Sequence, residues 1–132
     1  MLLSYLRTIY ATLISHEQKH MSKREEYNLA FYKIKDPDGG FIYSCEAKGN
    51  GNPYGMLYFL STLSTREVKH FIDTITLIKS SQPYDPDFMY TDGTEWLVLE
   101  FENPNFIIEQ TLTIHMDDLN SLMEEWLTFI QV

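Results

Sequence analysis

Two histidines stand four residues apart near the start of the chain, within the stretch HEQKH at 16–20. On a helix, His16 and His20 would share one face, where both could bind zinc while Glu17 acted as a general base. Lys19 lies between Glu17 and His20, however, and a cation beside a metal ion is electrostatically unfavourable. We therefore interpret the stretch as a solvated helix end and keep a small zinc metallopeptidase as an alternative function.

Other residues that carry chemistry lack the neighbours that their chemistry needs. Cys45 is the single cysteine, with no His or Asn close to it in the sequence to activate a thiol. The glycine-rich stretch 48–55 lacks the spacing of a phosphate-binding loop, and the acid-rich turns lack that of a calcium loop. The sequence thus predicts neither a catalytic residue nor a cofactor. A lone cysteine is typical of a reducing compartment, so we expect a cytoplasmic protein.

Charge is divided unevenly along the chain. The formal net charge is −9, which argues against binding to nucleic acid or to an anionic membrane surface, because both attract Lys and Arg. Residues 1–79 contain all ten basic residues and eight acids, whereas residues 80–132 contain eleven acids and no base. This asymmetry favours a docking surface for a basic partner, with a merely solubilising surface as the alternative.

Acids and aromatic residues are interleaved in the stretch YDPDFMYTDGTEW at 84–96, which contains four of each and no base. Tyrosine and tryptophan are common anchors of protein interfaces, although aromatic residues that simply cover a sheet edge would give the same pattern. Strand alternation over 95–102 places Glu100 and Glu102 on one face, and a hairpin with the following strand would add Glu109 to that face. We expect a basic partner to relieve the repulsion among these acids. The predicted partner-binding residues are Tyr84, Asp85, Asp87, Tyr90, Asp92, Glu95, Trp96, Glu100, Glu102 and Glu109.

Hydrophobic periodicity and turn residues predict the elements that position these side chains. We expect a helix over 2–20, strands over 27–35, 41–47 and 56–62, a helix that begins at Ser64, strands over 95–102 and 106–114, and a last helix capped by Asp117 or Asp118. The apolar run 56–62 is best interpreted as a buried central strand, with a helical segment as the alternative. The order α-β-β-β-α-β-β-α predicts an α+β fold: an antiparallel sheet of about five strands with helices packed on one face.

A single domain over 1–132 fits this length. The helix at 1–20 is either part of the core or an appendage, because Met21 offers a second translation start. The stretch carries polar residues and lacks a basic leading region, so we expect neither a signal peptide nor a membrane span.

The small size, the acidic charge, the lone cysteine and the aromatic–acidic stretch at 84–102 together resemble the immunity proteins of bacterial toxin–immunity pairs. The immunity proteins of contact-dependent growth inhibition systems are the most similar type. The resemblance implies a stoichiometric inhibitor that binds a cognate toxin, often a basic nuclease, and occludes its active site. A non-inhibitory acidic adaptor subunit would use the same surface and remains an alternative.

Overall fold

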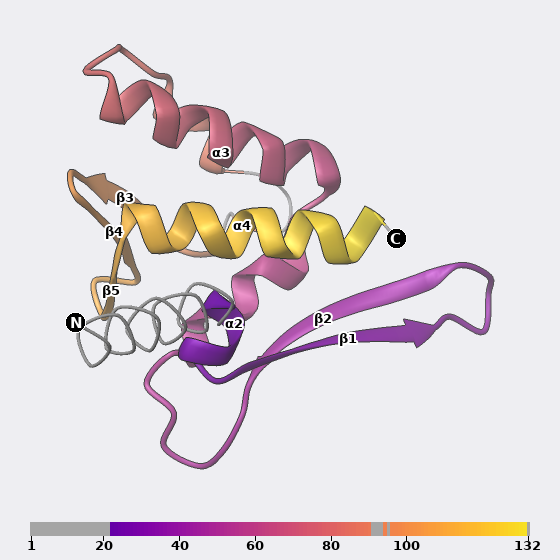
Figure 1. Ribbon diagram of the computed structural model, residues 1–132. Helices are drawn as coiled ribbons and strands as arrows, with labels where there is room; N and C mark the ends of the chain where they lie inside the picture. Colours follow the sequence, from indigo (N-terminus) through magenta and orange to yellow (C-terminus); the bar gives the residue numbers. More distant parts are fainter. Residues whose placement is uncertain (1–21, 91–93, 95, 132) are drawn as a thin grey trace, which may run out of the picture.

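The computed structural model describes residues 22–90, 94 and 96–131 (Figure 1). The helix predicted over 2–20, with His16 and His20, lies outside the described residues, as do Asp92 and Glu95. The elements in chain order are α2 (Lys23–Glu26), β1 (Leu29–Lys35), β2 (Phe41–Ala47), the 3₁₀ helix η1 (Gly55–Thr62), α3 (Thr65–Lys79), the 3₁₀ helix η2 (Pro86–Met89), β3 (Leu99–Glu102), β4 (Asn105–Ile108), β5 (Leu112–His115) and α4 (Met116–Gln131). None of the helices in this described part is long and apolar enough to cross a bilayer.

β1 and β2 form the predicted antiparallel hairpin, with Leu29 opposite Ala47 and Lys35 opposite Phe41. The turn between them places a glycine, Gly39, at φ +107°, a conformation that glycine adopts without steric cost. In Figure 1 the hairpin extends away from the rest of the molecule, so that its tip is remote from the three other strands.

The predicted central strand over 56–62 is wrong, because this run belongs to the 3₁₀ helix η1. A strand points alternate side chains to opposite faces, so Tyr58 and Leu60 would lie on the same side. Instead Leu60 is fully buried with Leu57 and Phe59, whereas Tyr58 is 45% exposed. A continuous apolar run is compatible with either conformation, and packing against β2 decides between them.

The edge of β2 is closed by η1 rather than by a third strand. The Ser61 hydroxyl accepts a hydrogen bond from the Cys45 backbone N–H at 2.7 Å and donates to the Cys45 carbonyl at 3.4 Å. A side chain thereby satisfies the backbone groups that a neighbouring strand would otherwise pair.

The other three strands form a separate antiparallel sheet in the order β3-β4-β5. The predicted strand 106–114 is divided, because Glu109 and Gln110 both adopt a left-handed backbone with φ +55° and turn the chain back on itself. The α+β class and the total of five strands are confirmed, but the strands form two sheets instead of one.

α3 and α4 lie side by side and cover the core (Figure 1). The capping box predicted for α3 is present: the Ser64 hydroxyl accepts from the Glu67 N–H, and the Glu67 carboxylate accepts from the Ser64 N–H. The predicted cap of the last helix is wrong, because α4 begins at Met116 and both candidate aspartates lie in its first turn. There the His115 Nδ1 atom accepts the backbone N–H of Asp117 at 3.0 Å and takes over the role of a capping side chain.

Leu60→Ala should lower the free energy of unfolding by about 2–5 kcal/mol, because it leaves a cavity in the core. Tyr58→Ala, two residues away on the same 3₁₀ helix, should cost far less, because its side chain is half exposed. Urea denaturation of both variants measures the difference. Equal losses would indicate that the run is a strand with both side chains on one face.

Candidate partner-binding surface

The three-stranded sheet has one face in the core and one face open to solvent. Leu99, Phe106 and Ile114 are buried on the inner face. The register places Glu100 opposite Ile107 and Glu102 opposite Asn105, so both glutamates project from the other face. The prediction that Glu100 and Glu102 share an exposed face is confirmed.

Val98, Glu100 and Glu102 are spaced two residues apart on an extended chain, so their side chains project from the same side of the sheet. We call these three residues the outer sheet face. Val98 is 45% exposed, and Trp96, two residues before it, is 81% exposed, the largest value among the exposed large hydrophobic residues that the structure describes. Sequence analysis missed Val98, although its spacing of two from Glu100 was a sufficient signal. The result is an apolar area bordered by carboxylates.

Glu109 does not join this group as a free carboxylate. Its Oε1 atom accepts the backbone N–H of Val98 at 2.7 Å, and its own N–H donates to the Val98 carbonyl at 2.7 Å. These bonds close the end of the hairpin formed by β3 and β4. Glu109 as a partner contact stays a prediction, and the structure shows that one of its carboxylate oxygens already accepts a backbone N–H in a turn.

The residues around η2 lie on the other side of β3. Tyr84 is half-buried, and its ring packs edge-on against Phe101 with the ring centroids 5.9 Å apart. Asp85 caps η2, and its Oδ1 atom accepts the Asp87 N–H at 2.9 Å. Tyr90 follows this segment and is 53% exposed. The structure thus separates the acids of η2 from those of the outer sheet face.

Cations from the N-terminal half of the chain neutralise part of the acidic C-terminal half. Lys79 Nζ lies 2.6 Å from Asp117 Oδ1, and Lys23 Nζ lies 3.2 Å from Asp118 Oδ1. Glu125 accepts the backbone N–H of Lys23 at 2.9 Å, at the N-terminus of α2. Among the residues that the structure describes, Glu100 and Glu102 form no ion pair, so surplus negative charge remains on the outer sheet face.

These pairings also shift the pKa values of the groups involved. The hydrogen bond from the Lys79 ammonium lowers the pKa of the Asp117 carboxyl below its ordinary 3.8. A hydrogen bond to Glu26, followed by contacts with Asp118, raises the pKa of Lys23. Both shifts favour the charged forms, as expected for opposite charges in contact.

The cysteine has the environment of a core residue. Cys45 is fully buried, and desolvation raises its pKa to about 12. A thiol that remains protonated at neutral pH is a poor nucleophile. Across the described ranges, no group of three or more His, Cys, Asp or Glu side chains could hold a metal ion.

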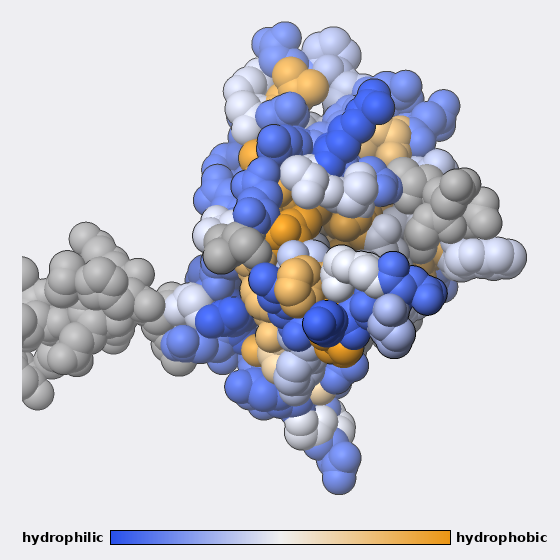
Figure 2. All heavy atoms as spheres, turned by 90° about the vertical axis from the view of Figure 1, so that its right-hand side faces the viewer, coloured by the Kyte–Doolittle hydropathy of each residue, from blue (hydrophilic) through white to orange (hydrophobic). Residues whose placement is uncertain are grey.

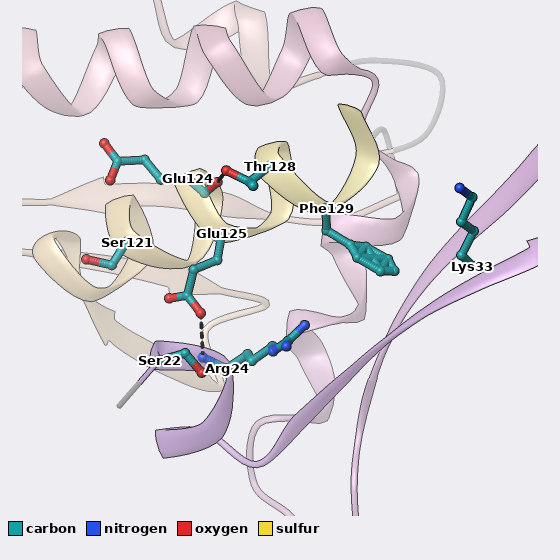
Figure 3. Close-up of a pocket in the computed structure, with 8 residues that line it drawn as sticks. All are labelled: Ser22, Arg24, Lys33, Ser121, Glu124, Glu125, Thr128 and Phe129. Atoms are coloured by element: carbon teal, nitrogen blue, oxygen red, sulfur yellow. Dashed lines mark hydrogen bonds between the residues drawn. The ribbon is translucent and has the colours of Figure 1, made fainter. Parts of the chain in front are cut away.

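A cavity of about 680 Å³ separates α2 and the hairpin from α4 (Figure 3). Its walls carry both signs of charge, with Arg24 on one side and Glu125 on the other. Glu125 is engaged with the N-terminus of α2, and the Arg24 guanidinium lies 5.2 Å from the ring centroid of Phe31. The cavity therefore lies between packed elements, and the charged groups Arg24 and Glu125 on its walls already have partners within the chain.

Lys79→Met should raise the pKa of Asp117 toward its ordinary value, because the largest cause of its lowering is removed. In the unmodified chain, this ion pair stabilises the folded state at pH values above the pKa that Asp117 has in the unfolded chain. The stabilisation is lost as the pH falls through the lower pKa that Asp117 has in the folded chain. NMR titration of the Asp117 carboxyl measures the change. Lys69→Met, on the same helix, is the matched control and should leave the titration unchanged. An unaltered pKa in the Lys79 variant would contradict the pairing.

The comparisons with known proteins identify no relative from which a site could be transferred. No family model, curated protein or solved structure matches this chain. The candidate surface is consequently defined by the exposure, charge and register of its own residues.

Proposed function

We propose that this chain is an immunity protein that binds a basic, nuclease-type bacterial toxin and occludes its active site. The observation that carries the proposal is the outer sheet face, where Glu100 and Glu102 lack cationic partners within the described residues and adjoin the exposed Val98 and Trp96. A basic surface on the toxin would complement both properties.

Electrostatics favours a basic partner on this face. Glu100 and Glu102 are two residues apart on one strand, on the same side, so their carboxylates repel each other. Lys or Arg from a partner would replace this repulsion with attraction and would also accelerate association. Tyr90 and Asp87 belong to the separate segment around η2 and would supply contacts beyond the outer sheet face.

Trp96 supplies the apolar part of the proposed contact. A tryptophan that is 81% exposed leaves a large ring in water, and burial of such a ring contributes strongly to binding when it fills a pocket on the partner. Charge then sets the approach and orientation, while the aromatic contact slows dissociation.

The proposal includes a cytoplasmic location, supported by a single cysteine that is buried and forms no disulfide. An adaptor that docks through the same face without inhibiting its partner would bind equally well. Growth rescue separates the two functions, because an adaptor has no reason to protect a cell from a toxin.

The double substitution Glu100→Lys and Glu102→Lys should weaken binding to the toxin about tenfold or more, because attraction becomes repulsion at the contact. The experiment co-produces this chain with the protein encoded by the adjacent upstream gene and measures both growth rescue and the dissociation constant at two salt concentrations. Binding should weaken as salt rises, because screening reduces the attraction.

The matched control is Glu25→Lys with Asp73→Lys, which changes the net charge equally at two other exposed positions. This control should retain both binding and rescue. Rescue by both double variants would remove the outer sheet face from the proposal, and tight binding without rescue would favour an adaptor.

A further inference from the structure

The hairpin of β1 and β2 is packed along its proximal half and exposed along its distal half. In the proximal half, Phe31 contacts the rings of Trp126 at 4.9 Å and Phe129 at 5.5 Å, and Tyr43 contacts Phe129 at 5.8 Å. Farther out, Ile34 and Phe41 are 53% and 52% exposed. A two-stranded ribbon without a covered face is marginally stable in water, so exposed apolar side chains on it indicate a contact surface.

The register makes one face of the distal hairpin aliphatic and places lysines with an aromatic ring on the other face. Ile34 lies opposite Ile42 on one face, and both are at least half exposed. Lys33 and Lys35 project from the other face, where Phe41 is directly opposite Lys35. The Lys33 ammonium lies 4.2 Å from the centroid of the Phe41 ring, a cation–π contact. We name Lys33, Lys35 and Phe41, which share this second face, the hairpin patch.

Among the described residues, the hairpin of β1 and β2 and the area around Trp96 together contain most of the exposed large hydrophobic side chains. Their charges are opposite: the strands of the distal hairpin contribute two lysines, and the outer sheet face contributes Glu100 and Glu102. The turn acids Asp36 and Asp38 lie beyond these strands, and the Asp36 carboxylate accepts the Asp38 N–H at 3.0 Å. The hairpin patch and the outer sheet face therefore each combine charged side chains with an exposed aromatic neighbour, and their charges are opposite.

The two surfaces cannot meet within one molecule. Figure 1 shows the tip of the hairpin toward one end of α4 and the three-stranded sheet toward the other end. Figure 2 views the molecule from the hairpin side and shows hydrophobic residues exposed between hydrophilic ones on that face. Because the two surfaces lie at opposite ends of one molecule, the hairpin patch of one copy can contact the outer sheet face of another copy.

We propose that the hairpin patch of one molecule docks on the outer sheet face of a second copy, with Lys35 against Glu100 and Glu102 and Phe41 against Trp96. The contact uses a different surface on each partner, so it is head-to-tail and adds further copies unless the chain of contacts closes. It goes beyond the proposed function, because it needs no toxin. It also competes with toxin binding, since both partners cover the same acidic face.

The test uses two variants that each damage one side of the contact, at positions exposed enough to spare the core. The hairpin variant carries Lys35→Glu and Phe41→Ser, and the sheet variant carries Trp96→Ser and Glu100→Lys. Analytical ultracentrifugation of the purified chain from about 10 μM to about 1 mM covers the range of weak protein contacts. Circular dichroism and thermal unfolding check that each variant is folded.

We expect the mass of the unmodified chain to rise with concentration and to fall with added salt, and each variant alone to remain monomeric over the same range. An equimolar mixture should form a dimer and nothing larger, because one intact hairpin patch meets one intact sheet face and both remaining ends are damaged. The single variants Lys35→Glu and Glu100→Lys should likewise each lose association about tenfold or more and recover it when mixed.

Three results would overturn the proposal: a monomeric unmodified chain at the highest concentration, a sheet variant that associates as well as the unmodified chain, or a mixture that stays monomeric. The second result would indicate contacts between two hairpins. None of these results bears on toxin binding, which is measured separately with the toxin present, so failure of one proposal does not imply failure of the other.

Discussion

Burial of one face of α4 holds the two sheets of this protein in place. Leu119 and Met123 are fully buried on that face, between α3 and the strands that precede the helix. Farther along, Trp126 stacks on Phe129 at 5.8 Å, and Phe31 meets Trp126 edge-on at 4.9 Å, so the base of the hairpin is fixed to the same helix. Two small sheets that share no hydrogen-bonded edge can therefore behave as parts of one folded unit.

The same arrangement sorts the charges of the chain. Acids on the first turn of α4 lie close to cations from α2 and α3, where they form ion pairs with Lys23 and Lys79. Acids on the outer sheet face have no such neighbours in the described part of the chain. Part of the surplus negative charge therefore lies on Glu100 and Glu102, close in sequence to the exposed Trp96. Such a surface is unfavourable in water for two reasons: an apolar side chain is exposed to solvent, and neighbouring carboxylates repel each other. A bound basic partner would remove both unfavourable terms.

Local patterns were sufficient for the parts of the fold that depend on near neighbours. The stripe of α3 and its capping box at Ser64 involve residues three or four apart, and the hairpin turn contains two glycines with positive φ. The common face of Glu100 and Glu102 follows from strand alternation alone. For the same reason the sequence also contained the signal for Val98, which shares their direction.

The sequence by itself determined the α+β class, the base-free C-terminal half and the exposed pair of glutamates, because each depends on composition or on spacing within a single element. The tertiary structure decided that 55–62 is a 3₁₀ helix, that Glu109 turns the chain, and that Asp117 is neutralised by Lys79 across 38 residues. These features depend on contacts between segments that are far apart in the chain. Such contacts form when the helices and sheets pack, and periodicity within one segment carries no information about them.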